Sequence, residues 1–149
     1  MRERFVNDMK EAMKSGDKAR LSTIRLINAA LKDRDIEARG QGKTVSDDDI
    51  LALLQKMVKS RQESAEIYEK NGRPELAAGE RAEIAVISSY LPQALSAEEA
   101  DAAIKAAIAE TGAATMKDMG KVVAALKAKY TGRMDFSKVS AQVKAALGG

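Results

Sequence analysis

The chain has 149 residues, of which 45% are hydrophobic and 32% charged, and its formal net charge is +3. This length suits one domain or two small ones, and the hydrophobic content is sufficient for a core. Cysteine and histidine are both absent, which excludes disulfides, thiol nucleophiles, Cys/His zinc sites and catalytic triads that use imidazole as the base.

The composition favours a helical, soluble protein. Only two prolines occur, while alanine, lysine, glutamate and leucine are plentiful, so we expect an all-α fold. No apolar run reaches the roughly 18–20 residues that span a bilayer, and the charged residues 1–5 are not followed by an apolar segment of secretory type. We therefore expect a cytoplasmic location and no contact with a membrane.

The first part of the chain is predicted to form four helices. A first helix covers about residues 2–15, and a second, capped by Asp17, runs to about Arg39. A third helix begins with Ser46 as its cap, and a fourth begins at Pro74. The residues of the second and fourth helices that we expect to face inward are Leu21, Ile24, Ile27 or Asn28, Leu31, Leu76, Ile84, Ile87 and Leu91.

Basic side chains lie off the buried stripe of the second helix. They are Arg20, Arg25, Lys32 and Arg34, and acidic residues are interspersed among them. Contact with phosphate is one interpretation, but an ordinary solvated face is favoured because of those acids.

The second part of the chain is predicted to form three helices. We expect a domain boundary at Tyr90–Leu95, since a proline there disfavours helix at the residue before it. Ser96 and Glu99 form a capping box that opens the fifth helix, and two further helices follow. The predicted architecture is an N-terminal four-helix domain, residues 1–92, followed by a small C-terminal three-helix bundle, residues 93–149.

The most sequence-specific stretch is residues 112–139. It predicts a helix from about Met116 to Tyr130, with a strip of small residues, Gly120, Ala124 and Ala128, opposite its buried face. The buried face is predicted to consist of Met116, Met119, Val122, Val123, Leu126 and Tyr130. A glycine inside a helix costs about 1 kcal/mol relative to alanine, so this one indicates that a backbone or ligand approaches closely, or that a neighbouring helix of the same domain packs tightly there.

Positive charge is concentrated at the C-terminal end. Residues 111–149 hold seven basic and two acidic side chains, whereas residues 41–110 hold eight basic and thirteen acidic ones. A basic patch attracts phosphate backbones through Coulomb attraction and counterion release; the alternative is that the lysines only solubilise an alanine-rich domain. With three tyrosines, two phenylalanines and no tryptophan, the chain has few aromatic residues for base stacking, so binding to the backbone of structured RNA is the form of RNA contact left open.

No catalytic constellation is evident. Without histidine or cysteine, an acid–base site needs paired carboxylates, a lysine or a tyrosine in a dry pocket. The acidic residues fall at helix starts and on polar faces, where capping and solvation explain them. Asp47, Asp48 and Asp49 point different ways round a helix, so a capping role is favoured over a metal site. We expect no metal ion and no cofactor.

Three motifs follow one another along the chain. They are DKARLSTIRL at residues 17–26, an EI pair at 83–84 leading to YLPQALS at 90–96, and MKDMGKVV at 116–123 followed by Thr131-Gly132-Arg133. Together they resemble the GatB/YqeY family over essentially the whole chain, and in particular its free-standing YqeY-like proteins. Val123 and the stretch 134–136 depart from the pattern of the family.

The resemblance implies a role near tRNA. The family is similar to the tail domain of the B subunit of the tRNA-dependent amidotransferase, in which the tail is understood to grip the tRNA body. The implied partners are tRNA or a translation-related protein. The RNA-binding residues that carry over are Lys117, Gly120, Lys121, Gly132 and Arg133, with Lys127, Lys129 and Lys138 as supporting positive charges.

Three hypotheses follow. The first is a non-catalytic tRNA-binding or tRNA-amidotransferase-related accessory protein. The second is a helical protein-interaction adaptor in which the strip of Gly120, Ala124 and Ala128 receives a partner helix. The third is an authentic amide-transferring enzyme, because the family label is carbon–nitrogen ligase activity with glutamine as amido-N-donor. That label is interpreted as inherited from the larger enzyme, whose ATP, metal and amidase elements have no counterpart in this sequence.

Overall fold

The computed structural model describes residues 1–148, apart from the side chain of Ser137, and is built from helices. Within that range it contains no strand, so the all-α prediction is confirmed. The elements are α1 (Arg2–Ser15), α2 (Lys18–Gly40), α3 (Asp47–Lys70), α4 (Pro74–Ser88), α5 (Ala97–Thr111), the short 3-10 helix η1 (Met116–Asp118), α6 (Met119–Tyr130) and α7 (Phe136–Ala146). The chain divides into two compact units, Met1–Leu91 and Pro92–Gly149.

The helix starts of the first unit follow their sequence signals. The side chain of Asp17 accepts a hydrogen bond of 3.1 Å from the backbone N–H of Arg20 at the start of α2. At the start of α3, Ser46 and Asp49 form a reciprocal capping box with bonds of 3.1 and 2.9 Å. Pro74 occupies the first turn of α4, where its missing N–H costs nothing. These three predictions are confirmed.

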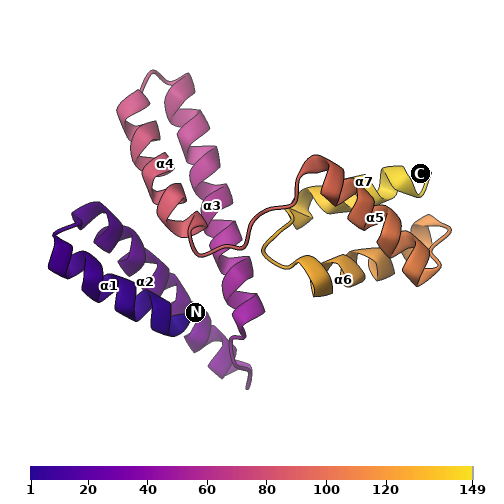
Figure 1. Ribbon diagram of the computed structural model, residues 1–149, viewed down its shortest axis with the longest axis horizontal. Coiled ribbons are helices and arrows are strands. Elements are labelled where there is room, and N and C mark those ends of the chain that lie inside the picture. The colour runs from indigo at the N-terminus through magenta and orange to yellow at the C-terminus, as the bar shows by residue number, and fades with distance from the viewer. Residues whose placement is uncertain (149) are drawn as a thin grey trace. The chain divides into compact units, whose positions relative to one another are not determined.

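The first unit consists of two helical hairpins, α1 with α2 and α3 with α4 (Figure 1). Helix α2 also contacts α3 and α4, so it is the element that joins the two hairpins. A single apolar cluster fills the junction; its buried members are Phe5, Ile27, Leu31, Ile50, Leu54, Met57, Ile87 and Tyr90. The burial of this cluster holds the hairpins together.

A polar junction reinforces that core. The hydroxyl of Tyr90 donates a hydrogen bond of 2.5 Å to Oδ2 of Asp8, and Nη2 of Arg20 lies 3.7 Å from the same oxygen. Burial, followed by the bond to Asp8, raises the pKa of Tyr90 to about 12. The guanidinium of Arg4 lies 4.9 Å from the centre of the Tyr90 ring. The first two sequence motifs therefore meet at Asp8, where they tie α1, α2 and the end of α4 together.

The second unit is a three-helix arrangement of α5, α6 and α7 (Figure 1). Ser96 and Glu99 form the expected capping box of α5, with bonds of 3.1 and 3.2 Å, and Gly112 ends the helix with a φ of 67°. The buried core is Ala103, Ile104, Ala107, Val122, Leu126, Met134, Val139 and Val143. Met134, which departs from the family pattern, is a core residue.

Two predicted core positions are wrong. Met116 is 38% exposed, because the carboxylate of Asp118 binds the backbone N–H groups of Ala114 and Thr115, and α6 proper begins only at Met119 after the 3-10 turn. Leu76 is 43% exposed, since the buried stripe of α4 begins one residue later, at the fully buried Ala77. No helix among residues 1–148 combines the length and the apolar character needed to cross a membrane.

Candidate nucleic-acid interface

The outer face of α6 is open. Gly120, Ala124 and Ala128 are all exposed, while Val122 and Leu126 on the opposite side are buried. A Cβ atom added at Gly120 would meet no other atom within 4 Å. The interpretation that this glycine admits a neighbouring helix of the same domain is therefore wrong for the part of the chain that the structure describes.

Lysines border this open strip. At about 100° per residue, Lys127 projects about 20° from Gly120 on one side, and Lys121 projects about 20° from Ala128 on the other. Lys117 precedes them in η1, and all three side chains are exposed. None of the three forms an ion pair with a residue whose side chain the structure describes. Lys127 makes a weak cation–π contact instead: its Nζ lies 6.0 Å from the centre of the Phe136 ring.

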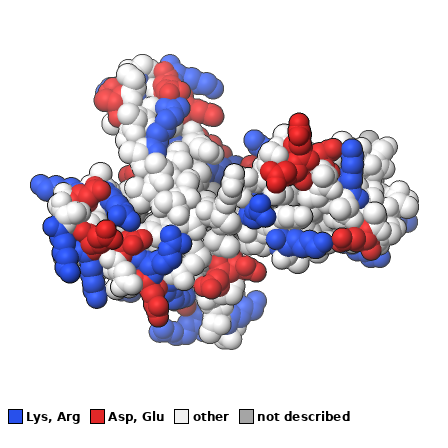
Figure 2. All heavy atoms as spheres, in the orientation of Figure 1, with Lys and Arg blue, Asp and Glu red and all other residues white. Residues whose placement is uncertain are grey.

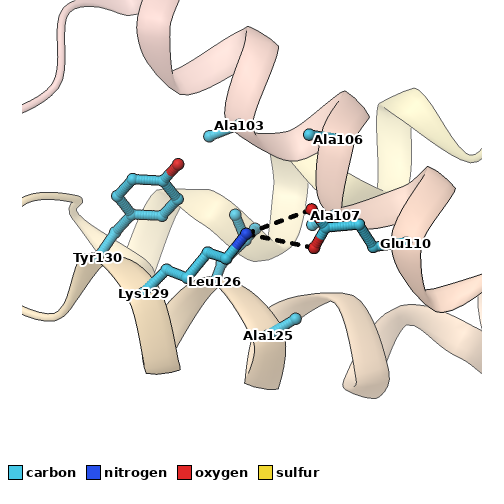
Figure 3. Close-up of a pocket in the computed structure, with 8 residues that line it drawn as sticks. All are labelled: Ala103, Ala106, Ala107, Glu110, Ala125, Leu126, Lys129 and Tyr130. Carbon is cyan, nitrogen blue, oxygen red and sulfur yellow. Dashed lines mark hydrogen bonds and ion pairs between the residues drawn. The ribbon is translucent and has the colours of Figure 1, made fainter.

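Lys129 is engaged elsewhere. Its Nζ lies 3.2 and 3.3 Å from the two carboxylate oxygens of Glu110, so it reaches from α6 to α5 across a shallow groove (Figure 3). The groove is lined by Ala103, Ala106, Ala107, Glu110, Ala125, Leu126, Lys129 and Tyr130. More than half of each partner's side chain is exposed, so the pair is weak and screened by salt. Lys129 is thus a cation that a stronger anion can attract away from Glu110.

Arg133 supports the fold of the second unit. Its Nε donates a hydrogen bond of 2.9 Å to the carbonyl of Gln93, and its own carbonyl accepts one of 2.9 Å from the backbone N–H of Leu95. Both bonds tie the segment before α5 to the turn between α6 and α7. No local pattern in the sequence indicates this tie, because the two partners lie 40 residues apart in the chain and one of them is a backbone carbonyl.

Gly132 is buried and has a φ of 84°. In this left-handed region a side chain is strained, so a glycine is favoured for the turn after α6. The residue therefore shapes the turn and offers no exposed surface to RNA. Lys138, at the start of α7, is exposed and forms no ion pair with a described side chain.

The charges of the second unit are unevenly distributed. Of the six acidic residues between positions 92 and 149, four lie on α5, whereas seven of the eight basic ones follow η1 or form part of it. Over this unit, the face that Figure 2 shows carries both signs. Asp118 has a lowered pKa, first because of the N–H of Ala114 and then that of Thr115, with a smaller effect of Lys121. It therefore stays ionised as a helix cap next to the lysines.

The exposed lysines around the strip of α6 give this surface positive charge. They stand beside small, exposed residues, Gly120, Ala124 and Ala128. Within residues 1–148 no three acidic side chains come together in a way that would hold a metal ion. What the site offers to a ligand is positive charge and room for close approach.

The chain is similar to one protein family and to several named proteins. The model of the family described as "Yqey-like protein" matches residues 2–147. A protein of Pyrenophora tritici-repentis is 30% identical over 151 residues, which is 97% of this chain and 80% of that protein. A protein of Lachancea thermotolerans is 36% identical over 94 residues, which is 63% of this chain and 49% of its own length. A protein of Saccharomyces cerevisiae is 28% identical over 94 residues, which is 63% of this chain and 50% of its own length.

All three relatives bear the name "Altered inheritance of mitochondria protein 41, mitochondrial". These names contradict the cytoplasmic location expected from the sequence, and that prediction is wrong by this comparison. It rested on the absence of a bilayer-spanning apolar run and of an apolar segment of secretory type, and neither absence distinguishes the cytoplasm from the interior of an organelle. The chain spans only about half the length of two of the relatives that it matches. Because the family model covers residues 2–147, the chain belongs to the YqeY-like protein family.

Proposed function

We propose that the protein is a non-catalytic RNA-binding accessory protein that holds the phosphate backbone of a structured RNA, with tRNA as its ligand. The observation that carries this proposal is the group of exposed lysines, Lys117, Lys121 and Lys127, around the open strip of α6. None of them forms an ion pair with an acidic side chain that the structure describes, although Lys121 helps to lower the pKa of Asp118. They are therefore available to an external polyanion.

Binding follows from charge and shape. Each lysine that meets a phosphate releases condensed counterions, which favours association at low salt. Small residues between the lysines let the RNA backbone lie against the helix. Base stacking contributes little in this proposal, because Phe5 and Tyr90 are buried and the other three aromatic rings, those of Tyr68, Tyr130 and Phe136, are half-buried. Such contacts position an RNA without reading its sequence.

The site proposed for RNA contact is narrower than the eight residues suggested by resemblance. Lys117, Lys121 and Lys127 form its centre, and Lys129 and Lys138 are supporting charges. Gly120 leaves the surface open, while Gly132 and Arg133 shape the turn that follows α6. This division follows from exposure and hydrogen bonding.

The test is a titration of the full chain with tRNA at several salt concentrations. The slope of log K against log [salt] is negative. In the double variant Lys117→Ala/Lys121→Ala it should become less steep by about two units, one for each phosphate that is no longer bound. The matched control is Lys105→Ala/Lys144→Ala, which removes two exposed lysines from α5 and α7 of the same unit. Equal slopes for the two folded variants would overturn the site.

We also propose a relation to amide transfer, in which the protein is a partner of an amide-transferring enzyme and does not itself catalyse the reaction. The resemblance to the tail of the amidotransferase B subunit suggests that the protein binds charged tRNA beside such an enzyme. Glutamine- and ATP-dependent amidation of charged tRNA should be absent with the purified chain alone. Turnover by the chain alone would instead favour an authentic carbon–nitrogen ligase.

A second candidate function is a protein-interaction adaptor. It is favoured by the same open strip of Gly120, Ala124 and Ala128, because small residues let a partner helix approach closely. Ala124→Leu fills the middle of the strip. It should abolish binding of a partner helix, while the salt dependence of RNA binding changes little because every positive charge remains.

We also propose that residues 1–92 and 93–149 are two domains, of four and three helices. The segment between α4 and α5 contains no helix, and each unit has its own apolar cluster. Limited proteolysis should cut first between residues 89 and 96 and leave two protected fragments. Degradation of the whole chain without such fragments would contradict the division.

A further inference from the structure

The outer face of α2 carries cations at a regular interval. Lys18, Arg25, Lys32 and Arg39 follow one another seven residues apart along this 23-residue helix. Ser22, Ala29 and Ile36 occupy the positions between them. All seven side chains are exposed, and we call the four cations the α2 stripe.

The α2 stripe is long and nearly straight. At 1.5 Å per residue, neighbouring cations are about 10.5 Å apart along the axis, and the whole stripe is about 32 Å long. A seven-residue repeat drifts by only about 20° per step around an α-helix, so the four side chains stay on one face. Ile24, Ile27 and Leu31 are buried, and at about 100° per residue their mean direction lies about 120° round the helix from that of the stripe. The stripe therefore lies on the exposed side of α2, with Arg39 nearest to the buried face.

Other cations of α2 are paired, whereas those of the stripe are not. Nη2 of Arg20 lies 3.7 Å from Oδ2 of Asp8, and Nη1 of Arg34 lies 3.6 Å from Oε2 of Glu37. No residue of the α2 stripe forms an ion pair with a side chain that the structure describes. Among the described cations of α2, only Arg20 pairs with another helix, because the Arg34–Glu37 pair lies within α2 and both of its side chains are largely exposed.

The acids of α2 do not cancel the stripe. Asp35 is bound by Arg2 through two hydrogen bonds of 2.7 and 2.8 Å, although Arg39 also helps to lower its pKa. Glu37 forms its ion pair with Arg34. Asp33 projects about 40–60° from the stripe positions Ala29 and Ile36, so it borders the face without lying within it. On the face that Figure 2 shows, both signs are interspersed over the first unit.

We propose that the α2 stripe is a second binding surface, for the phosphate backbone of double-stranded RNA. Its ligand class rests on the proposed RNA-binding function, but its residues belong to the other unit of the chain. A regular row of cations about 32 Å long matches a rigid polyanion with regularly spaced charges. A flexible single strand is usually held by aromatic stacking in addition to charge, and the stripe contains no aromatic residue.

The test compares four forms of the full chain on a 24-base-pair RNA duplex, on tRNA and on a single-stranded poly(U). They are the unmodified protein, Arg25→Gln/Lys32→Gln, the matched control Lys56→Gln/Lys59→Gln on the exposed side of α3, and Lys117→Ala/Lys121→Ala. At a slope of about −0.9 per phosphate bound, removal of one such interaction lowers affinity by about fivefold at 0.15 M salt. The stripe variant should therefore bind the duplex about 30-fold more weakly, and the α3 control should stay within about twofold.

A second variant tests the surface without removing a cation. Ala29→Glu places a negative charge between Arg25 and Lys32, and should weaken duplex binding by at least about fivefold, whereas Ala52→Glu on α3 should not. Exposed helix positions tolerate such substitutions, and circular dichroism verifies that each variant keeps its helix content.

The outcomes separate this inference from the function proposed for α6. Weaker duplex binding by the stripe variants than by the α3 controls, together with a smaller loss of binding to poly(U), supports the inference whatever the Lys117/Lys121 variant does. Binding of the stripe variants equal to that of the controls, with weakening only in the Lys117/Lys121 variant, overturns the inference and leaves the α6 site standing. Absence of binding by the unmodified protein at 0.15 M salt, or equal weakening for poly(U) and duplex, overturns the inference as well.

Discussion

Replacing Arg133 tests whether this arginine supports the fold or contacts RNA. Its Nε donates a hydrogen bond of 2.9 Å to the carbonyl of Gln93, and its guanidinium lies 6.0 Å from the centre of the Tyr130 ring. Hydrogen bonds to charged groups contribute about 1.5–3 kcal/mol, and partial exposure of the side chain reduces this by solvent screening. We expect Arg133→Ala to lower the free energy of unfolding of the second unit by about 1–2 kcal/mol.

Amide hydrogen exchange is the most local assay of this change. The backbone N–H of Leu95 donates to the carbonyl of Arg133 over 2.9 Å, so its protection reports directly on the tie between the α5 entry and the turn after α6. Exchange at Leu95 should become about 5- to 30-fold faster in Arg133→Ala, which corresponds to the expected change in free energy. The control is Lys138→Ala, which removes one exposed charge from the same unit and should leave Leu95 protected.

The lysine variant distinguishes the two roles. Arg133→Lys keeps the positive charge but lacks the planar Nε donor, so it should lose protection at Leu95 much as the alanine variant does. Unchanged protection in Arg133→Ala, together with weakened tRNA binding that Arg133→Lys restores, would refute the structural role and make Arg133 an RNA contact.

Three further substitutions test the packing and the polar junction. Leu126→Ala removes a side chain that is 1% exposed and should cost about 2–5 kcal/mol in urea unfolding; a cost below about 1 kcal/mol would contradict its place in the core. Gly132→Ala puts a Cβ on a residue with a φ of 84° and should cost about 1–2 kcal/mol, and an unchanged midpoint would show that the turn relaxes. Tyr90 has its pKa raised to about 12 in the folded chain, above the value of about 10 in an unfolded chain. Its contribution to stability is therefore complete below about pH 10 and disappears as the pH rises through about 12, so the stability gap between the native chain and Tyr90→Phe should close over that range in denaturation titrations. A gap that is constant from about pH 9 to 12 would contradict the raised pKa of Tyr90, whose first cause is burial and whose second is the bond to Asp8.

Local signals in the sequence predict the helices well. Ser46 with Asp49, and Ser96 with Glu99, are capping boxes that depend only on residues three positions apart, and both are present. The predicted start of α6, Met116, is three residues too early, since the helix begins at Met119. There the chain enters through a 3-10 turn stabilised by Asp118, and helical periodicity alone does not distinguish that turn from the helix.

Interactions between residues that are far apart in the chain could not be predicted from local sequence patterns. The local pattern presents Arg133 as a displayed cation, whereas its bond to Gln93 joins two segments that only the folded chain brings together. The basic residues of α2 look like one solvated group in the sequence. In the described part of the structure Arg20 forms an ion pair and Arg25 does not, and this difference depends on Asp8, which belongs to another helix. The seven-residue spacing of the α2 stripe is visible in the sequence, but its exposure follows only once the buried face is known.

The most direct test of RNA binding is a titration of the unmodified full chain with labelled tRNA and a DNA duplex of matched length. The affinity should be measured at salt concentrations from about 0.05 to 0.3 M. We predict tighter binding to tRNA than to DNA, and a linear fall of log K with log [salt] whose slope gives the number of phosphates contacted, about three or more. No binding to either near 0.15 M salt would contradict the account, and the exposed lysines of α6 would then be a solvated face.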